Sequence, residues 1–440
     1  MREPQEIRAG PAGVAHRIER AVRELRGVPL PVELTAWDGS RAGPSGTPRV
    51  ELRNTRALRH LLWSPGELGL ARAYVSGDLA VHGDLTDGLR RCWTLAREHQ
   101  VRSPRIGLRQ WPRLLTLAFR LGALGPRPKP PASEARMSGG LHTKRRDRSV
   151  IAHHYDAGNN FYQLLLDPRM AYSSGYWTSD GPGYGLADAQ EDKLELICRK
   201  LGLREATRLL DIGCGWGSLI IYAAQRYRVH ATGVTLSGEQ ARHIRGRIKE
   251  LGIAGQVEVR VQDYREIPDE PWDAIATIEM GEHVGEINYP AYAAALHRLL
   301  RPHGRLLLQQ MSRGRTAPGG GAFIESYVAP DMSMVPVSRT IEHLEQAGFE
   351  IRDVEGMRED YVRTVREWAW TLDDRWDDAV ALIGAEGARV WRLYLAGGAL
   401  AFEENRMGVN QILSVRPGTD GSSGLSATDR GWMPQERAGV

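Results

Sequence analysis

The pattern of apolar and polar positions divides the chain into a helix-rich first part and a second part in which strands alternate with helices. In the first part, residues 13–25 and 110–121 show the apolar spacing of amphipathic helices, and Arg49–Leu52 is a strand candidate. In the second part, helical stretches separate five apolar runs of strand length, RLLDIG, VHATGVT, VEVRVQD, WDAIATIE and GRLLLQQ. This alternation predicts an α/β fold with a doubly wound, mostly parallel, Rossmann-like sheet.

Local composition suggests four regions. Residues 1–124 are expected to form a smaller, mainly helical N-terminal domain. Residues 125–148 are rich in proline, glycine and basic side chains and lack apolar periodicity, which predicts a linker. The α/β domain is expected over residues 149–417, and the small, polar residues 418–440 predict a disordered tail.

The overall composition excludes several classes of protein. With 42% hydrophobic and 25% charged residues in 440, the chain is neither wholly disordered nor a collagen-like or disulfide-stabilised scaffold. The three cysteines, Cys92, Cys198 and Cys214, form no CxxC pair, so we expect no metal site and a reducing compartment. No apolar run is long enough to span a membrane, and the first residues lack the apolar core of a signal peptide. These features predict a cytoplasmic protein.

Positive charge is concentrated in one segment. The formal net charge is +4, but residues 101–148 contain 12 Lys or Arg and only two acidic residues, Glu134 and Asp147. A basic segment attracts polyanions, either nucleic acid or an anionic membrane surface, and the alternative is a solvated linker. Residues 110–124 are either an amphipathic helix at the membrane interface or a helix packed in the core.

A glycine-rich turn follows the first predicted strand of the α/β domain. Residues 211–217, DIGCGWG, open a helix, and glycine there allows a tight turn and close approach of the backbone to a ligand. Because the spacing is not GxGxxG and no GK[ST] follows, the pyrophosphate of NAD or a nucleoside triphosphate fits less well. The turn predicts a nucleoside-type cofactor at the carboxyl ends of the strands, the alternative being a purely structural turn.

This turn resembles the S-adenosylmethionine-binding motif of class I methyltransferases, and further motifs narrow the resemblance. In order along the chain these are HYD at 154–156, GNNFYQLLLDPRMAYSSGYW at 158–177, VTLSGEQ at 234–240, QDYRE at 262–266, EMGEHVG at 279–285 and YLAGGALAF at 394–402. Together they are similar to the cyclopropane-fatty-acyl-phospholipid synthase family, whose members transfer a methyl group from S-adenosylmethionine to a cis double bond of a lipid acyl chain. The similarity covers residues 150–415, and residues 66–85 resemble the N-terminal domain of longer bacterial members.

The resemblance implies a set of residues that bind S-adenosylmethionine. These are Tyr155, Tyr172, Ser173, Asp211, Gly213, Cys214, Gly215, Gly217, Thr235, Leu236, Gln240, Tyr264 and Arg265. Many class I methyltransferases end the second strand with an acid that holds the ribose hydroxyls, whereas this strand ends in Thr235 and Leu236. We therefore expect Gln240, on the following helix, to contact the ribose.

The resemblance also implies catalytic residues, because attack by the alkene leaves a carbocation that must lose a proton. The faces of Tyr155, Tyr172 and Tyr361 suit the cation, the alternative being core aromatics. Family members hold a bicarbonate ion as base; Glu282 and Tyr361 of that site are retained, whereas Ser174 replaces Cys and Gln309 replaces His. These replacements leave the use of bicarbonate open.

Glu279 stands where many members have glycine, three residues before Glu282. Two converging carboxylates raise one pKa, which suits a general base near neutral pH. The hypothesis is that Glu279 partly replaces bicarbonate, and the alternative is a capping or solvated carboxylate.

The altered base site bears on the product. Direct ring closure gives a cyclopropane, whereas a hydride shift before proton loss gives an exomethylene that a separate reductase converts to a methyl branch. The C-terminal part resembles actinobacterial members that make tuberculostearate-type branches. The expected partners are unsaturated phospholipid acyl chains and the anionic inner face of the membrane, bound peripherally; the oligomeric state stays open, a dimer included.

Two other functions remain. One is a class I methyltransferase of another small molecule or of RNA, with residues 101–148 as an RNA-binding arm, although no NPPY-like base-flipping motif follows the fourth strand. The other is a non-catalytic lipid-binding homologue, which the changes at Ser174 and Gln309 would favour.

Overall fold

The chain forms two compact units. The computed structural model describes residues 13–46, 48–99, 111–135, 143, 146, 158–315, 321–426 and 432. Unit 1 comprises residues 1–134, 321–323 and 384–400, and unit 2 comprises residues 135–320, 324–383 and 401–440.

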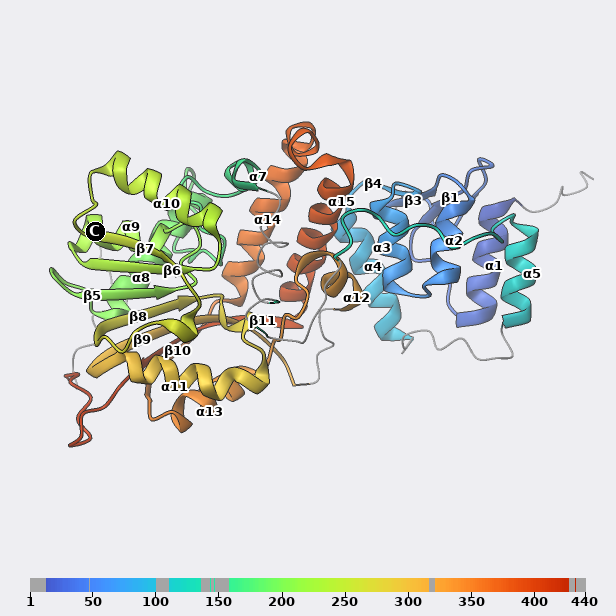
Figure 1. Ribbon diagram of the computed structural model, residues 1–440. Coiled ribbons are helices and arrows are strands. Elements are labelled where there is room, and N and C mark those ends of the chain that lie inside the picture. Colours follow the sequence, from blue (N-terminus) through green and yellow to red (C-terminus); the bar gives the residue numbers. More distant parts are fainter. Residues whose placement is uncertain are drawn as a thin grey trace, which may run out of the picture. The chain divides into compact units, whose positions relative to one another are not determined.

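Unit 1 combines short helices with a small sheet (Figure 1). Its helices include α1 (Val14–Arg26), α2 (Thr55–Trp63), α3 (Glu67–Val75), α4 (Leu85–Glu98), α5 (Trp111–Arg120) and α12 (Gly321–Phe323). Strands β1 (Glu33–Thr35), β2 (Arg41–Ala42), β3 (Arg49–Leu52) and β4 (Leu79–His82) pair in the order β2-β1-β3-β4. The side chains of Asn54 and Asp84 accept backbone amides at the starts of α2 and α4, which explains where these helices begin. The strand predicted at Arg49–Leu52 is confirmed.

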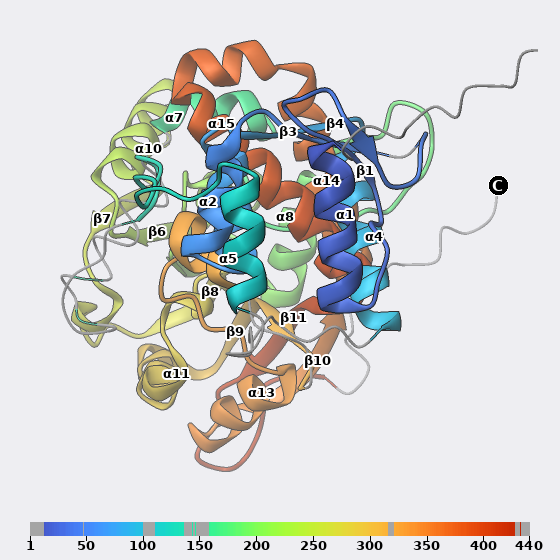
Figure 2. The same cartoon turned by 90° about the vertical axis from the view of Figure 1, so that its right-hand side faces the viewer.

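Helix α5 lies near α1 and α2 (Figure 2). It packs on them through one face and exposes apolar side chains on the other. Ala118 and Leu121 are buried with side chains of α1 and α2 around them. Leu115 is 47% exposed and Phe119 is 73% exposed. The core packing that the sequence offered as one alternative is therefore present, while the other, a helix at the membrane interface, stays a prediction. Gln110 lies outside the described residues.

The boundary between the units differs from the one expected near residue 124. Residues 125–134, assigned from composition to the linker, belong to unit 1. The Glu134 carboxylate accepts hydrogen bonds from Nε and Nη2 of the buried Arg72 at 2.8 and 2.5 Å, and the Gly125 carbonyl accepts one from Trp63. A proline-rich segment held by such side-chain contacts shows no apolar periodicity, so composition alone could not place it. Most of residues 136–148 lie outside the described part of the chain.

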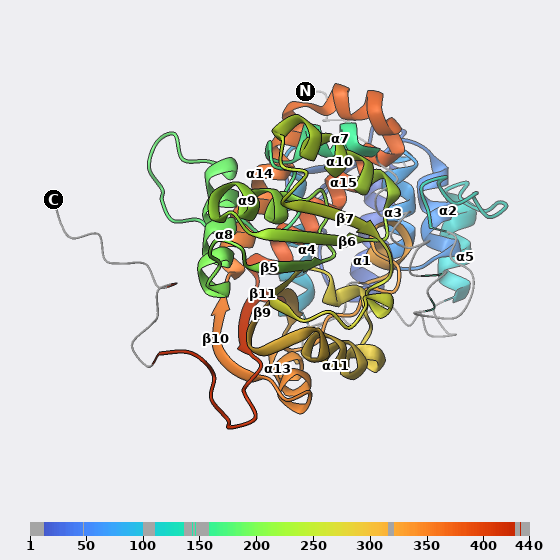
Figure 3. The same ribbon diagram turned by 60° about the vertical axis from the view of Figure 1, so that its left-hand side comes forward.

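Unit 2 is built on a seven-stranded sheet with the order β10-β11-β9-β8-β5-β6-β7 (Figure 3). The strands are β5 (Arg208–Ile212), β6 (His230–Thr235), β7 (Val257–Val261), β8 (Trp272–Ile278), β9 (Leu300–Arg313), β10 (Glu350–Gly356) and β11 (Met407–Val415). All five predicted strands are present, and the predicted α/β, doubly wound, mostly parallel sheet is confirmed. Strand β11 is the exception in direction, because it runs antiparallel to both β9 and β10.

Helices cover both faces of this sheet. The helices of unit 2 are α7 (Gly158–Leu165), α8 (Leu186–Leu201), α9 (Ser218–Tyr227), α10 (Gly238–Leu251), α11 (Tyr289–Leu299), α13 (Val337–Gln346), α14 (Arg358–Asp374) and part of α15 (Trp376–Glu403), which is divided between the units. On one face α8, α9 and α10 bury residues such as Ile197, Ile220 and Ile244. On the other, α11 and α13 bury residues such as Leu296 and Leu344. Burial on both faces explains why these strands read as continuous apolar runs.

Among the described residues no helix is both long and apolar enough to cross a membrane. Part of the predicted disordered tail, residues 418–426, is described and forms a turn in which the Gly418 amide donates to the Ser422 carbonyl. The Ser422 hydroxyl also lies 2.8 Å from Nε2 of His303.

Candidate active site

The glycine-rich turn connects β5 to α9 at the carboxyl end of the sheet. Gly213 has φ +83°, and a Cβ on it would lie 2.9 Å from the side chain of Met280. Gly217, with φ +85°, would place a Cβ 3.0 Å from Ile244. Both positions therefore need glycine for conformation and for space. The amides of Gly213 and Cys214 donate to the Val234 carbonyl, which fixes the turn beside β6.

A cavity opens where β5, β6, β7 and β8 end, as expected for a doubly wound sheet. Twelve of the predicted site residues line it: Tyr172, Ser173, Asp211, Gly213, Cys214, Gly215, Thr235, Leu236, Gln240, Tyr264, Arg265 and Glu279. Gly217 lies in the same turn without lining the cavity, and Tyr155 lies outside the described residues. The structure thus brings together residues that the sequence spreads from 172 to 279.

Gln240 presents an unpaired donor in this cavity. The hydroxyl of Thr235 donates to Oε1 of Gln240 at 2.7 Å, which orients the amide. Gln240 is buried, and its Nε2 has no hydrogen-bond partner within the described structure. A buried amide donor without a partner is costly, so a ligand acceptor such as a ribose hydroxyl fits here.

Asp211 and Lys193 are two buried charged residues that line the cavity. Burial raises the pKa of Asp211 to about 7, against the lowering effect of Lys193, and Oδ1 of Asp211 has no hydrogen-bond partner in the described residues. Lys193, on α8, donates from Nζ to Oγ of Ser173 at 2.9 Å, and burial lowers its pKa to about 8. Sequence reasoning missed Lys193, because a lysine within a helix is usually exposed.

Other cavity residues escaped prediction as well. They are Gln262, Asp263, Met280, His283 and Asp331, among others. Gln262 and Asp263 directly follow β7, and that position was the signal that could have found them. Asp263 binds Nε and Nη2 of Arg265 at 2.7 and 2.6 Å, which fixes the side chain of Arg265 at the cavity wall.

Glu279 is the centre of the predicted catalytic group. Its Oε1 accepts the Ser174 amide at 3.0 Å and Nε2 of Gln309 at 2.8 Å, and its Oε2 accepts the Tyr361 hydroxyl at 2.7 Å. The Ser174 hydroxyl instead donates to the Gly175 carbonyl, so this residue contributes its backbone amide. Burial raises the pKa of Glu279, and these three hydrogen bonds and Lys193 oppose the rise.

Glu279 also adopts a backbone conformation that favours glycine. Its φ is +52°, in the left-handed region, where a side chain costs roughly 1–2 kcal/mol. Its amide donates to the Gln309 carbonyl at 2.7 Å, which helps to hold this conformation. A glycine at this position would avoid the strain, so the carboxylate is present here despite a conformational cost.

Glu282, three residues after Glu279, is not among the residues that line the cavity. It is fully buried, its Oε1 accepts the Met311 amide at 2.6 Å, and its Oε2 has no partner within the described structure. Burial, and next the charge of Glu279, raise the pKa of Glu282 to about 8. The two carboxylates therefore do not converge on one pocket as expected, because only Glu279 lines the cavity.

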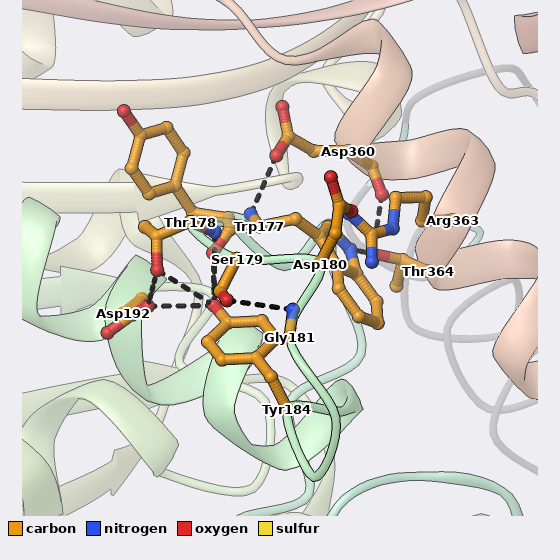
Figure 4. Close-up of polar contacts among 11 residues, drawn as sticks. Trp177, Thr178, Ser179, Asp180, Gly181, Tyr184, Asp192, Asp360, Arg363 and Thr364 are labelled. Carbon is orange, nitrogen blue, oxygen red and sulfur yellow. Dashed lines mark hydrogen bonds and ion pairs between the residues drawn. The ribbon is translucent and has the colours of Figure 1, made fainter.

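The segment that follows Ser174 is hydrogen-bonded to α14, the helix that carries Tyr361, and Figure 4 shows the part of this contact between Trp177 and Asp360. Oγ1 of Thr364 accepts the Gly175 amide at 3.0 Å and Nε1 of Trp177 at 3.1 Å, while Oδ1 of Asp360 accepts the Trp177 amide at 2.7 Å. Arg363 stacks 4.1 Å from the centre of the Trp177 ring. Trp177 therefore serves to attach the loop to α14.

Aromatic side chains connect the cavity to this group. Tyr172, which lines the cavity, packs 5.3 Å from Trp368, and Trp368 packs 6.1 Å from Tyr361. Tyr361 also contacts Phe402 at 4.6 Å between ring centres.

Comparisons with known proteins show which family this chain belongs to. The family model described as mycolic acid cyclopropane synthetase matches residues 142–412. A probable fatty acid methyltransferase from Mycobacterium tuberculosis is 38% identical over 90% of this chain and 93% of its own length. A tuberculostearic acid methyltransferase from the same organism is 30% identical over 94% of this chain and 93% of its own length.

A solved structure supports the same family assignment. It is a mycolic acid cyclopropane synthase complexed with SAH and CTAB, 30% identical, with a TM-score of 0.58, covering 61% of this chain and 97% of that one. These matches confirm the prediction of an S-adenosylmethionine-dependent methyltransferase with this cofactor. The chain belongs to the mycolic acid cyclopropane synthetase family.

Proposed function

We propose that the protein adds a one-carbon unit from S-adenosylmethionine to the cis double bond of unsaturated phospholipid acyl chains. The observation that carries the proposal is the carboxylate of Glu279, which lines the cofactor cavity and accepts hydrogen bonds from Ser174, Gln309 and Tyr361. A proton acceptor fixed beside a cofactor cavity is what removal of a proton from a carbocation requires.

The cavity residues fit the cofactor. S-adenosylmethionine supplies an electrophilic methyl group when bound. Gln240 would donate from its unpaired Nε2 to a ribose hydroxyl, and Asp211, whose Oδ1 is unpaired, would accept from the amino group of the methionine part. Lys193 and Ser173 would face the methionine carboxylate.

Aromatic side chains would stabilise the positive charge that forms on the acyl chain, and Glu279 would remove the proton that neutralises it. Attack by the alkene π electrons forms the new carbon–carbon bond and leaves a cation on the neighbouring carbon. The faces of Tyr172 and Tyr361 would stabilise this cation without bonding to it. Glu279 would then accept the proton, while Tyr361 and Gln309 keep its carboxylate oriented.

Glu279 would act as the general base in place of bicarbonate. The Ser174 segment, Gln309 and Tyr361 match positions that hold the ion in the family resemblance, and here all three donate to Glu279. A second anion in the same place would meet like charge from Glu279, which opposes binding. The proposal therefore needs no bicarbonate.

The proposed product is a mid-chain methylene. A hydride shift moves the cation to the carbon that bears the new methyl group, and loss of a proton from that methyl group gives the exomethylene. A reductase that delivers two hydrogen equivalents would complete a methyl branch. The tuberculostearic acid methyltransferase, which matches 94% of this chain, supports this outcome, whereas the cyclopropane synthase of the solved structure covers 61% of the chain.

Unit 1 would bring the enzyme to the inner face of the membrane. Trp63, Leu115 and Phe119 of this unit are 53%, 47% and 73% exposed, and apolar side chains at such exposure suit the membrane interface. The basic residues of 101–148 would add attraction to anionic lipids, at about 1 kcal/mol each near the surface.

The test uses the full-length protein, methyl-labelled S-adenosylmethionine and vesicles of a cis-monounsaturated phospholipid. Cyclopropane and exomethylene chains are isomers, so proton NMR of the isolated acyl chains, rather than mass alone, distinguishes them. Vinylidene protons are expected. Cyclopropyl protons would overturn the proposed product, and an absence of label in lipid despite cofactor binding would overturn the function.

A further inference from the structure

A second cavity of unit 2 lies on the far side of a wall that it shares with the cofactor cavity. Trp216 and Ser218 line both cavities. The second cavity is otherwise formed by the loop after α7, by the outer face of α9 and by α10. It has no role in the proposed chemistry.

The charged side chains of this second cavity are all basic. Arg169 comes from the loop, Arg226 from the last turn of α9, and Arg247 from α10. His243 stands one helical turn before Arg247, so the two share a face of α10. Within the part of the chain that the structure describes, no carboxylate lines this cavity.

The arginines are available to a ligand. Arg226 is exposed and forms no ion pair with any described residue. Arg169 pairs with Glu191, and Arg247 with Glu250 at 2.8 Å, but the members of both pairs are at least a third exposed. Exposed ion pairs contribute little to stability, so a competing anion can readily replace the carboxylate. Burial, and next the charge of Arg247, lower the pKa of His243, whereas the charge of Glu250 raises it.

We propose that Arg169, Arg226 and Arg247 form a binding site for a phosphate group. Guanidinium groups bind phosphate oxygens in pairs, and three of them from three segments can surround one tetrahedral anion. Resting on the proposed function, the phosphate is that of a membrane phospholipid headgroup, which would hold unit 2 at the bilayer next to its cofactor cavity. A free phosphate compound shares this chemistry and is separated from the headgroup by the experiment.

The experiment compares two double variants of the full-length protein that lose the same charge. R226Q/R247Q removes two arginines of the site. R228Q/R242Q is the matched control, since Arg228 and Arg242 follow or lie on the same two helices, are 72% and 70% exposed and lie outside the cavity. Binding is measured to inorganic phosphate by calorimetry and to vesicles of phosphatidylglycerol and phosphatidylcholine by sedimentation.

The expected result is that R226Q/R247Q weakens binding of both probes by about tenfold or more, whereas the control stays within about twofold of the wild type. Equal weakening in both variants would overturn the site, because general electrostatic attraction would then explain it. If R226Q/R247Q weakens binding of phosphate but not of vesicles, the phosphate site is supported and its ligand is a free phosphate compound. The assignment to a lipid headgroup would then be wrong.

Methyl transfer to a phosphate-free unsaturated lipid in neutral detergent separates this inference from the proposed function. The wild type and R226Q/R247Q should transfer methyl groups at equal rates there, and the variant should show a raised KM only with phospholipid vesicles. A wild type that methylates neither substrate would refute the proposed function, while the binding results would still decide the phosphate site.

Discussion

The hydroxyl of Tyr361 donates a 2.7 Å hydrogen bond to Oε2 of Glu279, although 82 positions separate the two residues in the chain. Tyr361 lies on α14, and Glu279 directly follows β8 at the edge of the cofactor cavity. The contact joins the C-terminal helices to the sheet at the point where proton removal is proposed. It therefore makes the orientation of one carboxylate depend on a distant helix.

Replacing Glu279 with Gln should lower kcat by about 100-fold or more, since a positioned general base contributes about 10²–10⁴. The amide keeps the volume and can still accept from Tyr361. Binding of S-adenosylmethionine, measured by calorimetry, should change by less than about threefold. Tyr361→Phe is the paired variant: it keeps the carboxylate and removes one hydrogen bond, so a smaller loss, of about tenfold, is expected. Equal kcat in Glu279→Gln and wild type would refute the proposed base.

Glu282 should make folding stability fall as pH rises. Its pKa is raised to about 8 in the folded protein from an ordinary 4.5, so the folded state binds the proton more tightly than the unfolded state. The resulting stabilisation is complete below pH 4.5 and is lost as pH rises through about 8. Urea unfolding of wild type and Glu282→Gln at pH 5.5, 7 and 8.5 measures it. The variant should gain stability relative to wild type as pH rises; a constant difference would contradict the raised pKa.

Replacing Lys193 with Met should weaken S-adenosylmethionine binding by about tenfold, because a charge-assisted contact to the cofactor carboxylate is lost. Lys200→Met is the matched control on the same helix. Lys200 is equally buried but pairs with Asp353 and Glu355, and it does not line the cofactor cavity. Both variants should lose stability, whereas only Lys193→Met should lose cofactor affinity. Equal affinity loss in both would indicate a structural role for Lys193.

Phe119→Ser should reduce sedimentation of the protein with anionic vesicles by about threefold or more, because an apolar side chain of this size contributes about 1.5–3 kcal/mol when buried. Ile287→Ser is the control, since Ile287 is an exposed apolar residue of unit 2 that lines neither cavity and has no part in the proposed membrane contacts. High salt should weaken binding further through the basic residues. Binding that responds to neither change would exclude unit 1 as the membrane contact.

Local pattern was sufficient for the sheet and for the cofactor turn. The five predicted strands and the turn from Asp211 to Gly217 depend on neighbouring residues, which periodicity and glycine spacing report. Lys193 could not be predicted, because its burial depends on the packing of α8 against the sheet. The hydrogen bonds to Glu279 come from residues 174, 309 and 361, so motif matching found the residues without the contacts. Unit 1 likewise includes residues 321–323 and 384–400, which only the tertiary structure assigns to it.

Replacing Thr364 with Val should lower kcat by about tenfold, although Thr364 does not line the cofactor cavity. The reason is that its hydroxyl holds the segment that donates to Glu279. Oγ1 of Thr364 accepts from the Gly175 amide and from Nε1 of Trp177, and the adjacent Ser174 amide reaches Glu279 at 3.0 Å. Valine has the same shape and leaves both donors without an acceptor, whereas Thr364→Ser retains the hydroxyl and should keep nearly full activity.

The pH profile of kcat distinguishes positioning from general destabilisation. Loss of the Ser174 hydrogen bond removes an effect that lowers the pKa of Glu279, so the activity of Thr364→Val should rise toward its maximum at higher pH than that of wild type. An unchanged profile together with a lowered melting temperature would mean that Thr364 stabilises the fold and does not position the base.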